Sequence, residues 1–137
     1  MDRIRLIQIL PLVLLALISS SVTGQKVDSS EQDSPTAEAA AKLFAKHCFS
    51  CHNDVDKEGD LSMQTFSALM QGGAEGPPLV PGNADESRLV LMVEGLVEPL
   101  MPEDDFLFDE DIKILRDWIN DGAPPWNGDL ERFKNKN

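Results

Sequence analysis

Cys48-Phe49-Ser50-Cys51-His52 is the stretch that decides the fold of this chain. The chain has 137 residues but only two cysteines and two histidines, and all four lie within residues 47–52. Two cysteines are too few for a disulfide framework or for a site with four thiolates. A short disulfide, a redox-active dithiol, a zinc site and the attachment site of a prosthetic group are the alternatives to compare.

The order C-x-x-C-H is the attachment signature of a c-type haem. Two thiols with this spacing can each add to one vinyl group on a haem edge, and the next residue then projects its imidazole toward the iron. We therefore expect Cys48 and Cys51 to attach one haem c covalently and His52 to ligate its iron. A disulfide across so short a loop stabilises little. A thioredoxin-like dithiol lies near a βαβ pattern, which is not evident here, and zinc needs ligands from separated positions.

The first 24 residues have the features of a secretory signal peptide. Arg3 and Arg5 precede a mainly apolar run over residues 6–18, and Val22-Thr23-Gly24 offers a small-residue cleavage site. The run is shorter than the roughly 20 residues of a spanning helix. We expect cleavage, a periplasmic or otherwise exported protein, and no membrane span afterwards; a retained anchor is the alternative.

Without residues 1–24 the chain has 10 Lys and Arg against 23 Asp and Glu, a net charge of −13. This charge excludes nucleic acid and anionic lipid surfaces as partners and favours a basic or neutral protein. Charge at this level also keeps proteins monomeric. A monomer that meets a redox partner, possibly a basic one, is the expectation.

Residues 25–35 are polar and read as a flexible linker, residues 36–127 as one domain and residues 128–137 as a polar tail. No stretch alternates with period two, so the domain is predicted to be all-α. About 90 residues of helices and loops bury only a small core, and a bound haem supplies the apolar centre that such a domain lacks.

Periodicity and capping signals predict four helices. They start near Ser34 or Thr36, at Thr65, at Ala84 and at Asp109. Their expected ends are His47, Gln71, Glu94 and Asn120, with glycines at 72, 73, 95 and 122 as stop signals. The third helix is predicted from a capping pair of Asn83 and Glu86, with an inner face of Leu89, Met92, Val93 and Leu96. Asp109 is the expected cap of the fourth, whose apolar face is Ile112, Leu115, Trp118 and Ile119.

The second axial ligand of the iron has five candidates, namely Met63, Met70, Met92, Met101 and His47. Core packing is the default role of Met70 and Met92, and His47 directly precedes Cys48 on the proximal side. Met101 is preferred because Pro99 and Pro102 stiffen its loop and because His/Met ligation is the usual arrangement in cytochromes c.

At these residues the chain resembles the planctomycete-type cytochrome c domain, a branch of the class I cytochrome c fold. The resemblance covers about residues 37–126. Its elements are residues 47–52, Gly59-Asp60-Leu61-Ser62-Met63, residues 72–77 and 79–83, Ser87-Arg88-Leu89-Val90, Met101-Pro102, Asp111-Ile112 and residues 118–124.

The resemblance implies an all-α class I cytochrome c fold, with short helices wrapped around one covalently attached haem. His52 and Met101 would be the axial ligands, and the carbonyl of Pro77 would orient the His52 imidazole. The first and last helices would cross near one haem edge, with Phe44 against Trp118. Glu103-Asp104-Asp105 departs from the family, which often has a second proline there, and makes the loop more acidic.

The function expected from these residues is transfer of single electrons between periplasmic partners, by a haem protein that is not an enzyme. The alternative is a haem c domain with an open sixth position, acting as a haem enzyme subunit or a sensor.

Overall fold

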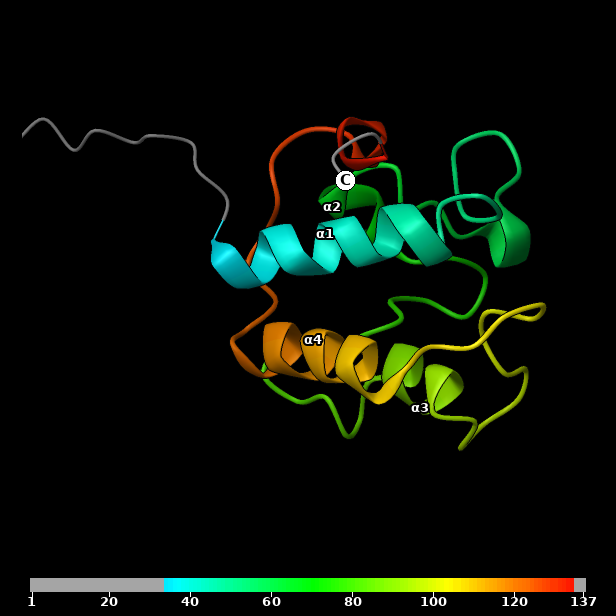
Figure 1. The fold of residues 1–137 in the computed structure, drawn as a ribbon. Helices are drawn as coiled ribbons and strands as arrows, with labels where there is room; N and C mark the ends of the chain where they lie inside the picture. Colours follow the sequence, from blue (N-terminus) through cyan, green and yellow to red (C-terminus); the bar gives the residue numbers. More distant parts are fainter. Residues whose placement is uncertain (1–33, 135–137) are drawn as a thin grey trace, which may run out of the picture.

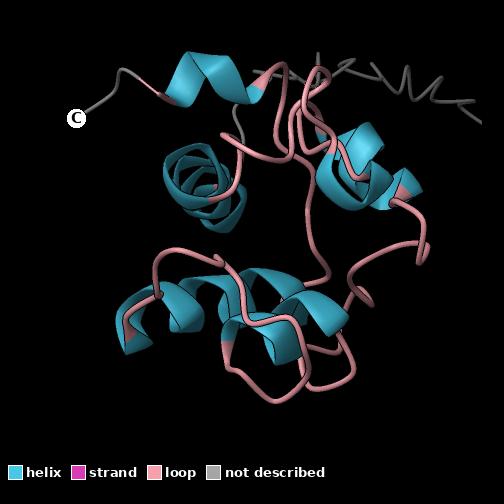
Figure 2. Ribbon diagram, turned by 90° about the vertical axis from the view of Figure 1, so that its right-hand side faces the viewer, coloured by secondary structure: helices cyan, strands magenta, loops and turns pink. Residues whose placement is uncertain are grey.

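The computed structural model describes residues 34–134. Helices and loops make up this part of the chain, without a strand, which confirms the all-α prediction (Figures 1 and 2). The elements are α1 (Pro35–His47), η1 (Glu58–Asp60), α2 (Phe66–Gln71), α3 (Arg88–Val93), α4 (Asp109–Asn120) and η2 (Leu130–Phe133), where η marks a 3-10 helix. None of these helices is long and apolar enough to cross a membrane. The expected signal peptide, and the expected linker up to residue 33, lie outside the described residues.

The first helix begins where its sequence predicts. The Ser34 hydroxyl accepts a hydrogen bond from the Ala37 amide at 3.1 Å, and Pro35 occupies the first helical position. This cap places the apolar side of α1 toward the interior, where Leu43 and Phe44 are buried. Helix α1 lies in the middle of the molecule, with η2 on one side and α4 on the other (Figure 1).

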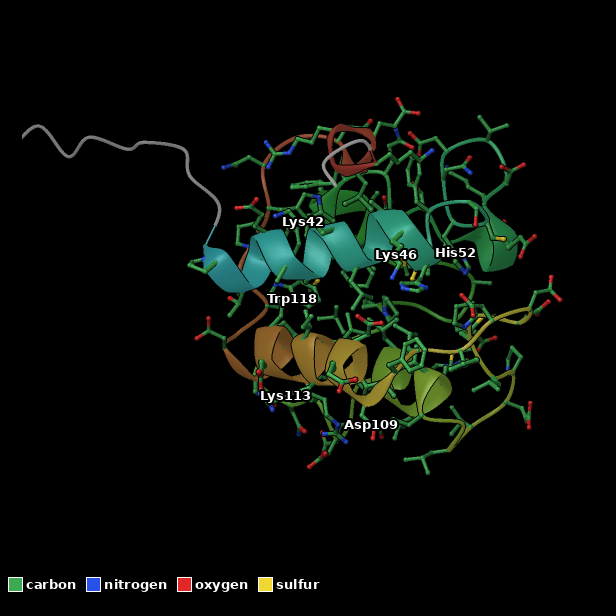
Figure 3. All side chains as sticks on the ribbon, in the orientation of Figure 1. Lys42, Lys46, His52, Asp109, Lys113 and Trp118 are labelled. Carbon is green, nitrogen blue, oxygen red and sulfur yellow. The ribbon has the colours of Figure 1, made fainter. Side chains whose placement is uncertain are left out.

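An aromatic cluster joins these elements. Phe44 meets Trp118 edge to face at a centroid distance of 5.5 Å, which confirms the predicted contact between α1 and α4. Trp126 lies 5.6 Å from Phe44, and Phe66 lies 5.4 Å from Trp126. Pairs of this kind contribute about 0.5–1.5 kcal/mol each beyond their area burial. Trp118 is labelled between the two helices in Figure 3.

The third helix is shorter than predicted, because it starts at Arg88 and not at Ala84. Asn83 does accept the Glu86 amide at 3.2 Å, but only in a turn. The fully buried Ser87 then donates its hydroxyl to the Asn83 carbonyl at 2.7 Å and accepts the Val80 amide at 2.9 Å. These bonds to residues four and seven positions earlier delay the helix start. Leu96 was expected on the buried face of this helix, and that prediction is wrong. Leu96 lies beyond the end of α3 and is 66 % exposed.

The fourth helix has the predicted bounds but a different cap. Phe108 is its N-cap, without a side-chain hydrogen bond, and Asp109 is the first helical residue. Asp109, Glu110 and Asp111 still stabilise the first turn through the helix dipole. Leu115, Trp118 and Ile119 are buried as expected.

The C-terminal segment differs from the expected polar tail. Leu130 and Phe133 of η2 are 0 % and 5 % exposed and pack in the core beside α1. The Leu130 amide donates to the Gln64 carbonyl at 3.0 Å, and the Gln64 side chain donates to Asp129. The packed unit therefore extends to at least residue 134, beyond the expected boundary at 127, because two apolar side chains three positions apart reach the core from a polar stretch.

Candidate haem-binding site

The two cysteines lie on one turn at the end of α1. The Cys48 amide bonds to the Phe44 carbonyl at 2.9 Å, and the amides of Cys51 and His52 both bond to the Cys48 carbonyl, at 3.2 and 3.0 Å. Cys48 is half-buried and Cys51 is exposed, and neither forms a disulfide. Two free thiols one turn apart, with an imidazole next to them, are the donor set that covalent haem attachment needs.

The thiol of Cys48 is a poor candidate for a dithiol redox centre. Burial, followed by the nearby Cys51 charge, raises the pKa of Cys48 to about 12. Reactive dithiols have a depressed pKa at a helix start, whereas Cys48 follows the end of α1. No group of three or more His, Cys, Asp or Glu residues in the described chain is arranged to hold a metal ion.

The His52 ring is oriented by a backbone carbonyl. Its Nδ1 lies 3.0 Å from the carbonyl oxygen of Glu58. A carbonyl can only accept, so Nδ1 carries the proton and the lone pair belongs to Nε2. Iron-ligating histidines are commonly held this way, with one ring nitrogen donating and the other free for the metal.

The role expected of Pro77 beside a bound haem stays a prediction. In the structure the carbonyl next to His52 belongs to Glu58, and Pro77 is exposed in the turn that follows Gly72. The physical reason is a tight loop after His52, in which Lys57 has a positive φ of 35°. The Glu58 amide bonds to the Cys51 carbonyl at 3.1 Å, so this loop folds back over the motif and reaches the imidazole first.

Asn53 holds the same turn from its outer side. Its amide group donates to the Phe49 carbonyl at 3.0 Å, and its side-chain oxygen accepts the amides of Val55 and Asp56. The sequence analysis did not predict roles for Asn53 or Glu58. The tendency of Asn to form side-chain turns marks the first, but no local signal identifies a backbone carbonyl six residues after the histidine.

The four methionines that are candidate distal ligands differ in burial, and Met101 stays the predicted one. It is half-buried against the core in the loop between α3 and α4, and its amide bonds to the Met92 carbonyl at 3.2 Å. Met63 is 2 % exposed within the core, which is the setting of a packing methionine. Met70 and Met92 are partly buried on α2 and α3.

The loop around Met101 presents apolar side chains to the outside. Of the seven large exposed hydrophobic residues in the described chain, five lie in residues 96–108. They are Leu96, Val97, Leu100, Phe106 and Phe108. Soluble proteins rarely expose so much apolar surface in one segment without a partner for it. An apolar surface beside a methionine, together with the thiols and imidazole of the motif, fits a haem.

His47, the outside candidate for the second axial ligand, faces acidic side chains. Its side chain is 8 % exposed, with Nδ1 3.5 Å from Asp105 and Nε2 3.7 Å from Asp111. The ring nitrogens therefore face two carboxylates.

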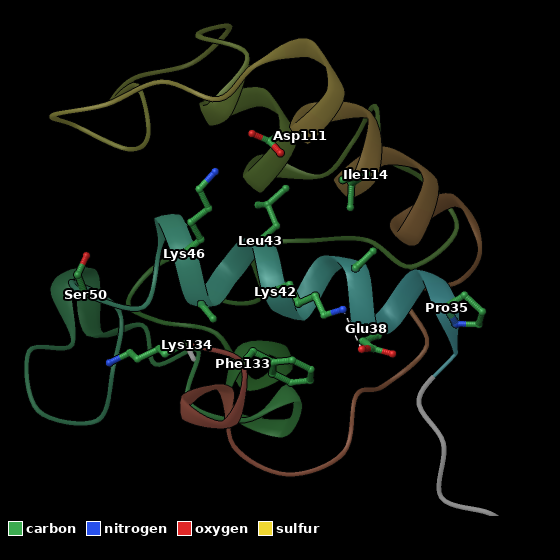
Figure 4. A pocket seen from close by; sticks show the side chains of 12 residues that line it. Pro35, Glu38, Lys42, Leu43, Lys46, Ser50, Asp111, Ile114, Phe133 and Lys134 are labelled. Atoms are coloured by element: carbon green, nitrogen blue, oxygen red, sulfur yellow. Dashed lines mark ion pairs between the residues drawn. The ribbon is translucent and has the colours of Figure 1, made fainter. Parts of the chain in front are cut away.

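A separate groove of about 860 Å³ runs along the outer side of α1, between η2 and α4 (Figure 4). Lys42 and Lys46 line it from α1, and Lys42 pairs with Glu38 at 2.9 Å. Ser50 of the motif lines the end of this groove, whereas neither cysteine, His52 nor Met101 is among its lining residues.

Residues 48–105, from the first cysteine of the motif to the acidic end of the Met101 loop, match the family model described as Planctomycete cytochrome C. Residues 48–105 are therefore similar to a planctomycete-type cytochrome c domain. This similarity points to a haem-binding, electron-transfer role, with covalent haem c as the cofactor. No curated protein and no solved structure matches the chain.

Proposed function

We propose that this planctomycete-type cytochrome c is an exported mono-haem carrier of single electrons between periplasmic partners. The observation that carries the proposal is the hydrogen bond of His52 Nδ1 to the Glu58 carbonyl beside two free thiols. It leaves Nε2 as the ligating nitrogen without any rearrangement of the ring.

Each residue of the site has one task in this proposal. Cys48 and Cys51 hold the haem by thioether bonds, His52 is the proximal ligand and Met101 is the distal ligand. The bound haem supplies a one-electron Fe(III)/Fe(II) couple. Thioether ligation and apolar surroundings such as Leu100 favour the less charged reduced iron and raise the potential. The helices would surround the cofactor in a class I cytochrome c fold.

The alternative function, a haem enzyme subunit or sensor, needs an open sixth position. A peroxidase-like site also needs a distal acid–base residue. The chain has one histidine besides His52, and both ring nitrogens of that His47 face carboxylates. This arrangement favours the carrier over the enzyme.

Export supports the same proposal. Haem c is attached outside the cytoplasm in bacteria, and residues 1–24 carry the sequence features of a cleavable leader. Mass spectrometry of the exported protein should give a mature N-terminus at or near Gln25. A retained segment 1–24 would make the protein membrane-anchored.

Covalent attachment is tested by removing both thiols. The exported wild-type protein should keep its haem through acid–acetone extraction, whereas the Cys48→Ala/Cys51→Ala double variant should lose it, because the chain has no other cysteine. Each single variant should retain at most one thioether. Haem that stays bound to the double variant after extraction would refute the attachment.

The partner is proposed to be a protein with a basic surface around an apolar centre. Residues 96–112 contain seven Asp and Glu and no Lys or Arg. The same segment carries the exposed Phe106 and Phe108, which contact each other at a centroid distance of 5.0 Å. A charged rim around an apolar centre is the usual composition of a protein interface.

A further inference from the structure

The Glu58 carbonyl that faces the His52 ring lies in an exposed loop. Residues 58–60 form η1, and all three are exposed. Lys57 and Asp60 have positive φ values of 35° and 59°, which residues other than glycine rarely adopt. A strained backbone of this kind persists only where the surrounding structure holds it. Contacts from outside the loop therefore decide where the Glu58 carbonyl lies.

A second loop, of residues 72–76, packs directly on the first. The Ala74 amide donates to the Gly59 carbonyl at 2.9 Å. A Cβ atom on the neighbouring Gly73 would lie 2.3 Å from the Gly59 carbonyl oxygen and 2.9 Å from the Leu61 nitrogen. Both atoms belong to the backbone, so no side chain could turn away to make room. Gly73 has no positive φ, so space and not backbone conformation requires a glycine there.

Leu61 connects this packing to the histidine. Its amide donates to the Glu58 carbonyl at 3.2 Å, and His52 donates to the same oxygen from Nδ1 at 3.0 Å. The Glu58 amide in turn bonds to the Cys51 carbonyl at 3.1 Å. The Glu58 peptide is thus held from the motif on one side and from the packed loop on the other. A displacement of residues 59–61 would move the acceptor of the His52 ring.

We propose that Gly73 is a positioning residue for the proposed proximal ligand, because its lack of a side chain sets the place of the Glu58 carbonyl and thereby the orientation of the His52 ring. An imidazole whose Nδ1 donates to a carbonyl is a more basic ligand through Nε2. A more basic ligand favours the oxidised, more charged iron and lowers the reduction potential. The ring orientation is a property of the chain, and only its effect on the iron rests on the proposed function.

Gly73→Ala in the full exported protein tests this role. The added Cβ has to push residues 59–61 away, which lengthens or breaks the bond between His52 and Glu58. In proton NMR spectra of the reduced protein, the Nδ1 hydrogen of His52 should exchange with solvent about tenfold faster than in the wild type, the equivalent of one ordinary hydrogen bond. The reduction potential, measured by voltammetry, should rise because the ligand becomes less basic.

Two further variants separate positioning from a general loss of stability. Ala74→Pro removes the amide hydrogen that bonds to Gly59, so it should release the same loop and give the same two changes. Gly82→Ala is the matched control, since Gly82 has a φ of 81° and an added Cβ would have no atom within 4 Å. It should lower the unfolding free energy through backbone strain but leave the His52 signal and the potential as in the wild type. If Gly73→Ala does not fold, Ala74→Pro alone decides the outcome.

The exchange rate and the potential together decide between the outcomes. Wild-type values of both in either folded loop variant would overturn the proposal. An exchange rate raised equally in Gly82→Ala would also overturn it, because the effect would then be a loss of stability. The Nδ1 signal does not require a ligated iron. A wild-type protein without haem would therefore refute the proposed function, whereas the NMR data would still decide the role of Gly73.

Discussion

At the scale of single residues, His52 and Glu58 show how a small domain can orient the imidazole of the proposed iron ligand. The histidine follows the second cysteine, so its backbone is set by the turn at the end of α1. The Glu58 carbonyl then selects the ring tautomer at a distance of 3.0 Å. A backbone acceptor is insensitive to side-chain substitution, so the orientation depends on the fold of the loop and not on the identity of residue 58.

Met101 is the residue whose replacement separates a carrier from an enzyme. Met101→Ala should open the sixth position, remove the methionine–iron band, lower the reduction potential and allow carbon monoxide to bind the reduced iron. An absorption spectrum into the near infrared, with and without carbon monoxide, measures this.

Met92→Ala is the matched control for that experiment. Met92 is partly buried on α3, so its loss should cost about 2 kcal/mol of unfolding free energy, the low end for a core truncation, with an unchanged spectrum. If Met92→Ala lost the methionine–iron band and Met101→Ala kept it, Met92 would be the distal ligand. An unchanged spectrum in both variants would favour Met63, Met70 or an open site.

At the scale of elements, the domain is held by the packing of α4 and η2 on two sides of α1. The Phe44–Trp118 pair joins α1 to α4, and Trp126 extends the cluster toward the C-terminal segment. Short helices such as α2 and α3, of six residues each, are not stable alone. Their stability comes from tertiary burial, and in the proposed function also from the haem.

The C-terminal 3-10 helix should therefore contribute to stability. Leu130→Ala removes a side chain that is 0 % exposed and should cost about 2–5 kcal/mol of unfolding free energy, measured by urea denaturation. Val55→Ala, at a side chain that is 90 % exposed, is the control and should change it by less than about 0.5 kcal/mol. An unfolding free energy of Leu130→Ala equal to that of the wild type would show that η2 does not contribute to stability.

At the scale of the whole molecule, charge is distributed unevenly. The chain carries a formal net charge of −12, and the groove along α1 is lined by Lys42, Lys46 and Lys134 together with Glu38 and Asp111. Residues 96–112, by contrast, contain seven Asp and Glu and no Lys or Arg. For the proposed basic partner, a field of this form would favour approach toward the Met101 loop.

The association rate with a basic redox partner should therefore decrease with salt. We expect a fall of about an order of magnitude between about 0.02 M and about 0.5 M ionic strength, measured by stopped-flow electron transfer. Glu103→Gln/Asp104→Asn should reduce both the low-salt rate and the salt slope. Glu86→Gln, an exposed acid outside the loop, is the control. A rate that is constant or rises with salt would contradict steering by this surface.

Short-range signals in the sequence were sufficient to predict the turn of the C-x-x-C-H motif after the first helix, the start of α1 and the bounds of α4. Ser34 and Pro35 specify a helix start through bonds within one turn, and the C-x-x-C-H spacing is itself local chemistry. Contacts beyond a single helical turn decided other features. Ser87 is buried and bonds to Val80 and Asn83, seven and four residues earlier, and this moved the start of α3 past the Asn83 turn.

The fold of the loop after the motif places the Glu58 carbonyl beside the His52 ring, and Leu130 extends the core into an apparently polar tail. Only the tertiary structure also brought Asp105 and Asp111 to His47 from two other elements. The physical reason is the same in each case. Capping and periodicity depend on neighbours within a few residues, whereas the partner of a carbonyl or a ring nitrogen depends on how the whole chain packs.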